Sequence, residues 1–405
     1  MTDRGRVRTW VLAVAGLSVA GVATLGVRLA FSTKVKIVPG SGRNVVDANS
    51  SLRQISQAIA RGDGMALAVL KSRLGEKPQI VDPLKVSLEA PSAMTEKQSE
   101  DWADVLASLR MGFSRFSTYG RTSAVVMTVE ILHKFDAVPV PAGWVDVLRP
   151  SSEVLNSALV DQMWEVRAAA LVELKAVWTW GPQRDLFRGE VDQLSRWKES
   201  FLSPVTARLV DHDARIRTSA VACLGTLPLN DAAEQAVRLL SDTDGNVRFQ
   251  VLISFADRPT LLTEEAILPL LYDLNPYIPA MAERILKIRG LTPEMIGLGK
   301  LIVNPRPEMR MSAIPSLKDR QDIDPGVWLL YLTRDSEESV RLKAIEALAN
   351  RMTPEAKKRL LEMADTDTSK TVREAAEKLL PEGETTATLP PLPTSTGAGL
   401  KLKAN

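Results

Sequence analysis

Apolar residues recur three and four positions apart along most of the chain, which is the spacing of amphipathic helices. Residues 51–75 show it at Leu52, Ile55 and Ile59. The alternation of apolar and polar residues that is typical of a strand never extends beyond a few residues. Aromatic residues make up only 5% of the chain, and its apolar content is mostly Leu, Ala and Val, which suits helices. The sequence therefore predicts an all-α chain.

An aliphatic residue followed by arginine recurs with a nearly constant period. At the arginine position the copies fall at residues 217, 248, 279, 310, 341 and 373, so the intervals are 31, 31, 31, 31 and 32. Only Pro279 departs from arginine at this position. Earlier copies at Arg121 and Arg167 are separated by 46 and 50 residues from the copies that follow them, which indicates insertions. Such regularity is the signature of a repeat protein.

A second signal has the same period. Residue types that cap helix N-termini well stand before the first helix of successive repeats. Three of them are followed directly by proline, which is favoured at the first position of a helix. The capping residues are Asn230, Thr263, Thr292, Asp324 and Thr353. Each repeat is therefore a helix, a short turn and a second helix. The stripe Val340, Ala344, Ala347 and Leu348 predicts one buried face, which only a neighbouring repeat can cover. The expected fold is an α-solenoid with a period of about 31 residues.

The combination of an Asp-rich turn, Val-Arg and an Ala-rich helix, as in "SDTDGNVRFQVL" at 241–252, resembles HEAT-like repeats of the phycobilisome-lyase type. The resemblance covers 150–380 well and 50–150 loosely. It implies a solenoid fold, and it implies either a binding scaffold or a cofactor lyase. It also implies a ladder of turn carboxylates and arginines along the stack. The residues that match this ladder are Asp161, Arg167, Asp211, Arg217, Asp242, Asp244, Arg248, Arg310, Asp335, Arg341, Asp365 and Arg373. The resemblance pairs residues of one turn: Asp242 and Asp244 with Arg248, Asp335 with Arg341, and Asp365 and Asp367 with Arg373.

The turn at 241–252 has acidic residues like those of a calcium loop, but neither register places a glycine at position 6 and a glutamate at position 12. The only histidines are His133 and His212, and neither is followed by Glu, which excludes a di-iron site built from repeated His-Glu pairs. Gly-x-Ser-x-Gly, His-Glu-x-x-His and a complete phosphate-binding loop do not occur. The sequence therefore predicts no catalytic, cofactor-binding or metal-binding residue, and no cofactor.

Tryptophans cluster in the longest insertion, at 164–201. Tryptophan is enriched at the centres of protein interfaces, so this segment is a candidate partner-binding surface. The alternative is that the side chains fill a gap between imperfect repeats. The four residues are Trp164, Trp178, Trp180 and Trp197.

The N-terminus predicts a membrane segment. A basic tail, 1–8, precedes an apolar stretch at 9–31, whose uncharged run of 19 residues would span roughly 28 Å as a helix. We expect a single-pass anchor in the cytoplasmic membrane with the repeats on the extracytoplasmic side. The alternative is a signal peptide, cleaved near residue 21 or 24, which would leave a secreted or periplasmic protein.

The remaining organisation follows from composition. Residues 32–50 form a linker, 51–150 degenerate helical repeats, 151–380 the repeat solenoid and 381–405 a disordered tail rich in Pro, Thr and Gly. With 51 basic and 49 acidic residues and no basic stripe, nothing indicates a nucleic-acid partner. We expect a membrane-tethered scaffold that binds other proteins and has no catalytic activity. The alternatives are a cofactor lyase or chaperone-like enzyme, and a structural envelope protein.

Overall fold

A computed structural model describes residues 46–75, 96–134, 144–179, 191–227, 231–317, 320 and 322–380 of the chain. Every regular element in these ranges is an α-helix or a short 3-10 helix, which confirms the all-α prediction for this part of the chain. None of the helices in these ranges combines the length and apolarity that spanning a bilayer requires. The predicted segments 1–8, 9–31 and 381–405 lie outside the described residues.

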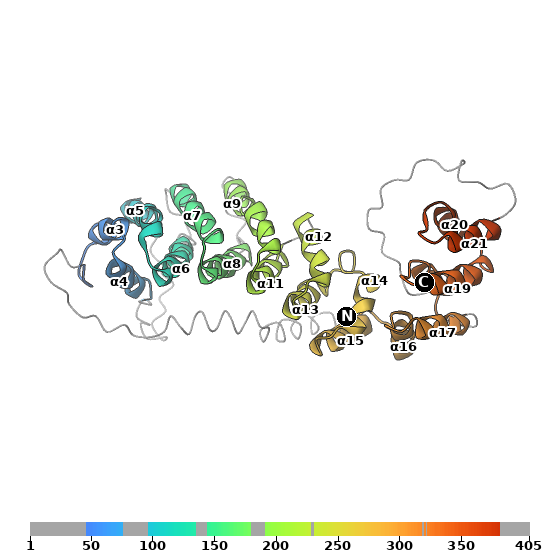
Figure 1. The fold of residues 1–405 in the computed structure, drawn as a ribbon. Helices are drawn as coiled ribbons and strands as arrows, with labels where there is room; N and C mark the ends of the chain where they lie inside the picture. Colours follow the sequence, from blue (N-terminus) through green and yellow to red (C-terminus); the bar gives the residue numbers. More distant parts are fainter. Residues whose placement is uncertain are drawn as a thin grey trace, which may run out of the picture. The chain divides into compact units, whose positions relative to one another are not determined.

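The chain forms two compact units, residues 1–239 and 240–405, which are described separately. In the first unit, α3 packs on α5 and α5 on α7, while α4 packs on α6, α6 on α8 and α8 on α11 (Figure 1). First and second helices of successive pairs thus form two layers. The helices are α3 (Leu52–Ala60), α4 (Gly64–Gly75), α5 (Glu96–Gly112), α6 (Thr118–Lys134), α7 (Trp144–Leu159), α8 (Trp164–Thr179), α9 (Val191–Glu199), α10 (Leu202–Thr206), α11 (Ala214–Leu224) and α12 (Asp231–Val237), with the 3-10 helices η2 (Phe113–Arg115) and η4 (Ala207–Val210).

The second unit continues the helix-turn-helix pattern. Its second helices include α13, which packs on α15, and α17, which packs on α19, followed by α21 against α19. The elements are α13 (Gly245–Phe255), α14 (Glu264–Ile267), η6 (Leu268–Tyr272), α15 (Tyr277–Ile288), α16 (Pro293–Ile302), α17 (Pro307–Leu317), α18 (Pro325–Leu332), α19 (Glu338–Ala349), α20 (Pro354–Thr366) and α21 (Lys370–Leu379); η5 (Arg238–Ser241) lies at the boundary between the two units.

The first helices of the second unit begin at the predicted caps. The side chains of Thr263, Thr292 and Thr353 each accept a hydrogen bond from the backbone N–H three residues later, at 3.2–3.3 Å. Asp324 accepts from the N–H of Gly326 at 2.9 Å. These contacts satisfy N–H groups that have no partner inside the helix, and they explain why each helix begins there. Asn230 lies outside the described residues.

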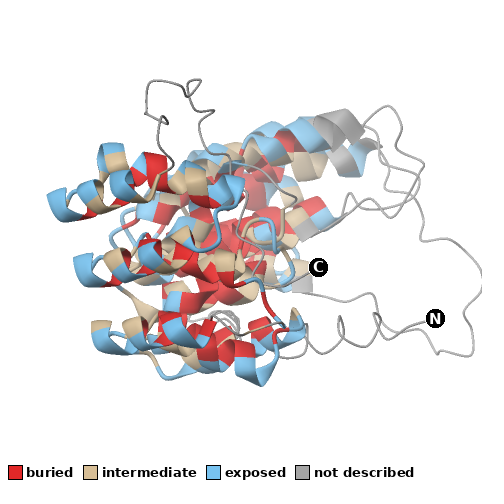
Figure 2. Cartoon of the chain, turned by 90° about the vertical axis from the view of Figure 1, so that its right-hand side faces the viewer, coloured by how far each residue is buried: buried red, intermediate tan, exposed pale blue. Residues whose placement is uncertain are grey.

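The core runs between the helical layers (Figure 2). The aliphatic residue before the arginine position of the repeat is fully buried at Val247, Ile278, Val340 and Val372. In the predicted stripe of α19, Val340, Ala344 and Leu348 are buried, whereas Ala347 is only partly buried and Ile345 takes the fully buried place beside them. The C-terminal repeat ends this core. The outward residues of α21 are polar, as expected of a terminal repeat: Thr371, Glu374, Glu377 and Lys378 are exposed.

Gly245 has a different role from the one its turn position suggests. It is the first residue of α13, and its backbone does not have a positive φ; among the described residues only Gly62 and Gly290 do. A Cβ atom at Gly245 would lie 2.6 Å from Nδ2 and 3.0 Å from Cβ of Asn275. The glycine is therefore required by the close approach of the following turn, not by a reversal of the chain.

Candidate functional site

The turn between the two helices of a repeat begins with an acidic residue that organises its own backbone. In six turns an aspartate Oδ1 accepts a hydrogen bond from the N–H two residues later, at 2.8–3.0 Å. This contact fixes the turn and leaves the other carboxylate oxygen available. The six residues are Asp161, Asp211, Asp242, Asp273, Asp335 and Asp367. In the third of these turns Asp244 caps α13 by accepting from the N–H of Asn246 at 2.7 Å.

Each ladder arginine donates hydrogen bonds to the backbone of its own turn. Nη1 donates to the carbonyl oxygens six and five residues earlier, at 2.7–3.4 Å. The arginines with both contacts are Arg167, Arg217, Arg248, Arg310 and Arg341. These bonds hold each guanidinium group in one orientation, with its opposite edge turned away from its own turn.

That opposite edge binds the aspartate of the following turn. Nε and Nη2 lie 2.6–3.2 Å from the two carboxylate oxygens in every such pair. The pairs are Arg121 with Asp161, Arg167 with Asp211, Arg248 with Asp273, Arg310 with Asp335 and Arg341 with Asp367. In the Arg248, Arg310 and Arg341 pairs both nitrogen atoms donate hydrogen bonds, which is the bidentate and strongest arginine–carboxylate geometry. In the Arg121 and Arg167 pairs only Nη2 donates one, and Nε contributes charge attraction. Each arginine therefore joins two consecutive turns, and we call each such contact a rung.

This arrangement corrects two predicted details. Asp335 was paired with Arg341 of its own turn, but its carboxylate binds Arg310 of the preceding repeat, and only its carbonyl oxygen binds Arg341. Asp365 is exposed near the end of α20 and takes no part in a rung. Asp367, two residues later, begins the turn and holds the rung instead.

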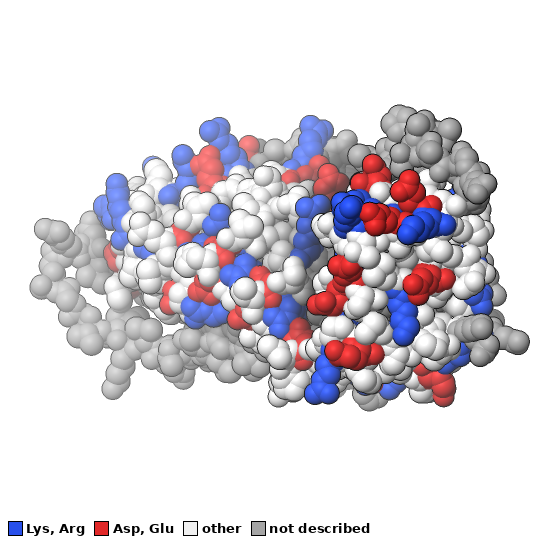
Figure 3. Space-filling model, turned by 45° about the vertical axis from the view of Figure 1, so that its right-hand side comes forward, with Lys and Arg blue, Asp and Glu red and all other residues white. Residues whose placement is uncertain are grey.

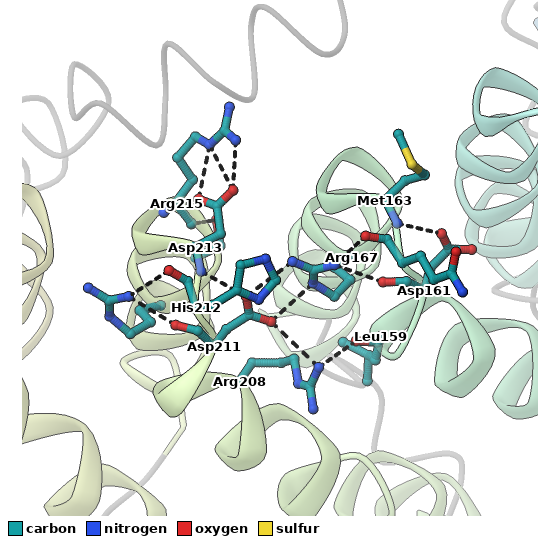
Figure 4. A network of polar contacts seen from close by, with 12 residues as sticks. Leu159, Asp161, Met163, Arg167, Arg208, Asp211, His212, Asp213 and Arg215 are labelled. Carbon is teal, nitrogen blue, oxygen red and sulfur yellow. Dashed lines mark hydrogen bonds and ion pairs between the residues drawn. The ribbon is translucent and has the colours of Figure 1, made fainter.

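The rung between Arg167 and Asp211 is the most buried, with side chains 4% and 3% exposed (Figure 4). Arg208 approaches the same carboxylate at 3.5 Å and donates to the carbonyl oxygen of Leu159 at 3.2 Å. His212 is exposed at its edge, 3.3 Å from Asp211. In the part of the chain that the structure describes, no group of three or more His, Cys, Asp or Glu side chains is arranged to hold a metal ion.

Two rungs also lower the pKa of their aspartates. Burial raises the pKa of Asp273 and of Asp367, but the hydrogen bond from the rung arginine, the hydrogen bond from the turn N–H and the attraction of the arginine charge together outweigh it and leave each pKa below the ordinary value of 3.8. The hydrogen bond to Asp273 raises the pKa of Arg248. Arg248 and Asp273 are thus both charged at neutral pH.

The ladder is interrupted in the middle of the second unit. Pro279 occupies the arginine position in α15, and the acidic position of the following turn holds Asn304. Asn304 still organises its turn, because its Oδ1 accepts from the N–H of Arg306 at 2.9 Å. Its Nδ2 donates to Tyr272 Oη at 2.7 Å. Pro279 cannot supply the positive charge of a ladder arginine, and the neutral amide of Asn304 stands where other turns have an aspartate. The chain thereby avoids an aspartate whose charge would have no arginine partner.

Packing is also altered at this place. Second helices pack closely before and after it, whereas α15 and α17 make only sparse contact. Met309 occupies the aliphatic position that is fully buried at Val247 and Val340, yet it is 39% exposed. Leu274 and Tyr277 in the preceding turn are 97% and 72% exposed. We call the turn edge formed by 272–279 and 303–310 the interruption site.

A pocket of about 370 Å³ adjoins the interruption site. Two charged pairs line it: Arg334 lies 2.9 Å from Glu265, and Arg310 lies 2.6 Å from Asp335. Burial raises the pKa of Tyr331, which also lines the pocket, to about 12. Its apolar lining comes from Pro269, Ile302, Val303 and Pro305. The charges of the pocket thus neutralise each other in pairs.

The three described tryptophans of the insertion each contact other parts of the chain, and partner binding by this segment stays a prediction. Trp197 is buried, donates from Nε1 to the carbonyl oxygen of Leu148 at 2.8 Å and meets the Phe201 ring edge-on at 5.0 Å. It is therefore unavailable to a partner. Trp178 is half-buried and donates to the carbonyl oxygen of Lys198 at 3.1 Å. Trp164 begins α8 and lies under the Arg215 guanidinium group, 3.5 Å from ring centre to Cζ. Trp180 lies outside the described residues.

The sequence analysis did not identify two features of the repeats, although both can be read in the sequence. Pro279 was recognised as a departure from the repeat, but the matching change at Asn304 was not. A second arginine series, at 258, 289, 320 and 351, also has intervals of 31 residues and stands at the opposite ends of the second helices. Arg289 shows its role, since it donates to the carbonyl oxygens of Leu262 at 2.5 Å and Ala256 at 3.1 Å.

Stacked helix pairs with short turns define the class of α-helical repeat proteins. Within this class, residues 297–381 match the family model of HEAT repeats. The match begins in α16, between Pro279 and Asn304, the two positions at which the ladder is interrupted. It supports the predicted HEAT-like character of the chain at this coarse level; the narrower phycobilisome-lyase type stays a prediction.

Comparison with other proteins adds little beyond the fold class. No curated protein matches the sequence. Among solved structures, one match is a chain from a study of tubulin recruitment and assembly by microtubule polymerases with tumor overexpressed gene (TOG) domain arrays. It is 14% identical, the alignment covers 81% of this chain and 75% of that chain, and the TM-score is 0.32.

Proposed function

We propose that the chain is a protein-binding scaffold and that the interruption site is its main contact surface. One observation carries the proposal: at the single place in the described chain where both rung positions depart from the repeat, the normally buried aliphatic position of the second helix is also exposed, at Met309. Leu274, Tyr277 and Met309 provide the apolar surface. Repeat arrays commonly bind partners along such extended surfaces, and departures from local rules concentrate at functional sites.

Charge supports recognition of a protein over recognition of a polyanion. On the face drawn in Figure 3, basic and acidic side chains are interspersed, with no broad surface of one sign. The pocket beside the interruption site repeats this balance on a smaller scale, because each arginine in it faces a carboxylate. An apolar contact surrounded by paired charges resembles the usual interface, in which a polar rim encloses an apolar centre.

The double variant Leu274→Ser/Tyr277→Ser tests this proposal. We expect it to weaken partner binding by at least about 30-fold, since truncating an aromatic anchor in an interface commonly costs 2 kcal/mol or more. The measurement is site-specific photocrosslinking from position 274 and from position 277 in membranes, followed by affinity measurement with the partner so identified. Thermal stability should not change, because both side chains are exposed.

The matched control is Val210→Ser, which alters an equally exposed apolar residue in a turn that keeps its rung. If crosslinking from position 210 recovers the same partner with the same yield, or if the double variant binds normally, the interruption site is not the contact surface.

We further propose that residues 9–31 tether the scaffold to the cytoplasmic membrane with the repeats on the extracytoplasmic side. The length of the uncharged run and the basic residues before it support this proposal. We expect the mature protein to retain Met1 or Thr2 and to resist extraction from membranes at high pH. A mature N-terminus near residue 21 or 24, found by mass spectrometry, would show a cleaved signal peptide instead.

A further inference from the structure

The last ladder arginine of the described chain differs from the others in what it holds. Arg373 in α21 donates from Nη1 to the carbonyl oxygen of Asp367 at 2.6 Å, so its guanidinium group is held by its own turn as in the earlier repeats. No later turn follows within the described residues. Nε and Nη2, the atoms that bind a carboxylate in five other repeats, have no partner in the described part of the chain.

Neighbouring carboxylates do not fill this position. The Asp367 carboxylate is bound to Arg341 and to the N–H of Ser369, so only its carbonyl oxygen serves Arg373. Glu374 is paired with Lys370 at 3.3 Å. Glu377 lies one helical turn from Arg373 and is exposed, and an exposed pair at that spacing would contribute only about 0.3–0.5 kcal/mol.

The five occupied rungs define the ligand that this position fits. In each of them the same two nitrogen atoms receive an aspartate that is presented by a turn. A guanidinium group that is already oriented loses little freedom when it binds, which favours the same planar, two-oxygen ligand. The polar outer side of α21 also suits a hydrated polypeptide segment better than another apolar helix.

No aspartate follows Arg373 in residues 374–405. Rung aspartates follow their arginines by 25 to 44 residues. The two glutamates of residues 381–405, Glu382 and Glu384, follow Arg373 by only 9 and 11 residues.

We propose that Arg373 is a preformed carboxylate-binding site at the end of the repeat array, and that its ligand is an aspartate in a turn of another polypeptide. The partner would continue the ladder by one rung. This site is separate from the interruption site, and its existence does not depend on the function proposed above.

The test uses the full chain and a blocked peptide with the sequence SDTDGN of residues 241–246, a turn that carries such aspartates. Phenylglyoxal modification, read residue by residue by mass spectrometry, should label Arg373 faster than Arg341, whose carboxylate-binding edge is occupied. Millimolar peptide should slow the labelling of Arg373, and the peptide SNTNGN should not. Labelling of Arg53, which is exposed, should be unaffected by either peptide.

A second measurement separates a bidentate site from simple charge attraction. Binding of fluorescent SDTDGN to Arg373→Lys should be about tenfold weaker than to the unaltered chain, because lysine keeps the charge but cannot make the paired contact. The control Arg53→Lys, at an exposed arginine in α3, should bind normally. Equal protection by the two peptides, or equal binding by Arg373→Lys, would overturn the proposal. Labelling of Arg373 that becomes fast only in Glu382→Gln/Glu384→Gln would show that the chain's own tail occupies the site and would exclude an external ligand.

Discussion

Replacing Arg167 by methionine is expected to lower the free energy of unfolding of the α8–α11 region by about 3 kcal/mol, the low end of the cost of breaking a buried ion pair. The side chains of Arg167 and Asp211 are almost wholly buried, so the variant leaves the Asp211 carboxylate without its main cation. Arg208 at 3.5 Å and the N–H of Asp213 at 3.0 Å compensate in part. Urea-dependent hydrogen exchange of peptides from α8 and α11 measures the loss.

The chain itself suggests how the loss can be reversed. Where the ladder lacks an arginine, at Pro279, the next turn holds Asn304 and keeps its backbone contact. The double variant Arg167→Met/Asp211→Asn should therefore be more stable than Arg167→Met alone. Arg149→Met is the control, since Arg149 forms an exposed pair with Glu153 and should change stability by less than about 0.5 kcal/mol. If adding Asp211→Asn lowers stability further, an unpaired carboxylate is not the cause of the loss.

Replacing Gly112 by alanine is expected to destabilise the packing of α3 on α5 by about 3 kcal/mol, the upper part of the usual range for overpacking. A Cβ atom there would collide with the carbonyl oxygen of Ile59 and would lie 2.7 Å from Cζ of Phe116. The backbone of α3 cannot move aside as a flexible side chain could. Hydrogen exchange of α3 and α5 should rise together.

The comparison variant is Gly297→Ala in α16. No atom lies within 4 Å of a Cβ at that position, and alanine favours a helix over glycine by about 1 kcal/mol, so this substitution should stabilise its helix. If Gly112→Ala is also neutral or stabilising, α3 and α5 do not approach each other as closely as the structure indicates.

The repeat pattern was sufficient to predict the fold and the first-helix caps, because both depend on residues close together in the chain. Thr263, Thr292, Asp324 and Thr353 each bond within three residues. The partners in each rung could not be predicted in the same way. An arginine such as Arg341 follows one turn aspartate by 6 residues and precedes the next by 26, and a strict period is compatible with either pairing.

The contacts of residues in the insertions were harder still to predict from the sequence. Trp197 lies in a segment without the repeat period, so its burial against Leu148 and Phe201 had no signal in sequence. Gly112 illustrates the same limit, since a glycine near a helix end looks like a weak helix former until the neighbouring helix is placed beside it. The interruption site could be predicted only in part. The sequence shows that Pro279 replaces an arginine, but recognising a contact surface also requires the matching change at Asn304 and the exposure of Met309.

The double contact of each ladder arginine also bears on how the array unfolds. A stack of repeats behaves as a one-dimensional lattice, in which the free energy that couples neighbours decides how many repeats melt together. Each rung adds to that coupling, and the absence of a rung between Pro279 and Asn304, together with the sparse contact of α15 and α17, makes it weakest there within the second unit. We therefore expect the repeats from α16 to α21 to open together without the preceding repeats of that unit, so a partner bound across the interruption would join two cooperative blocks into one.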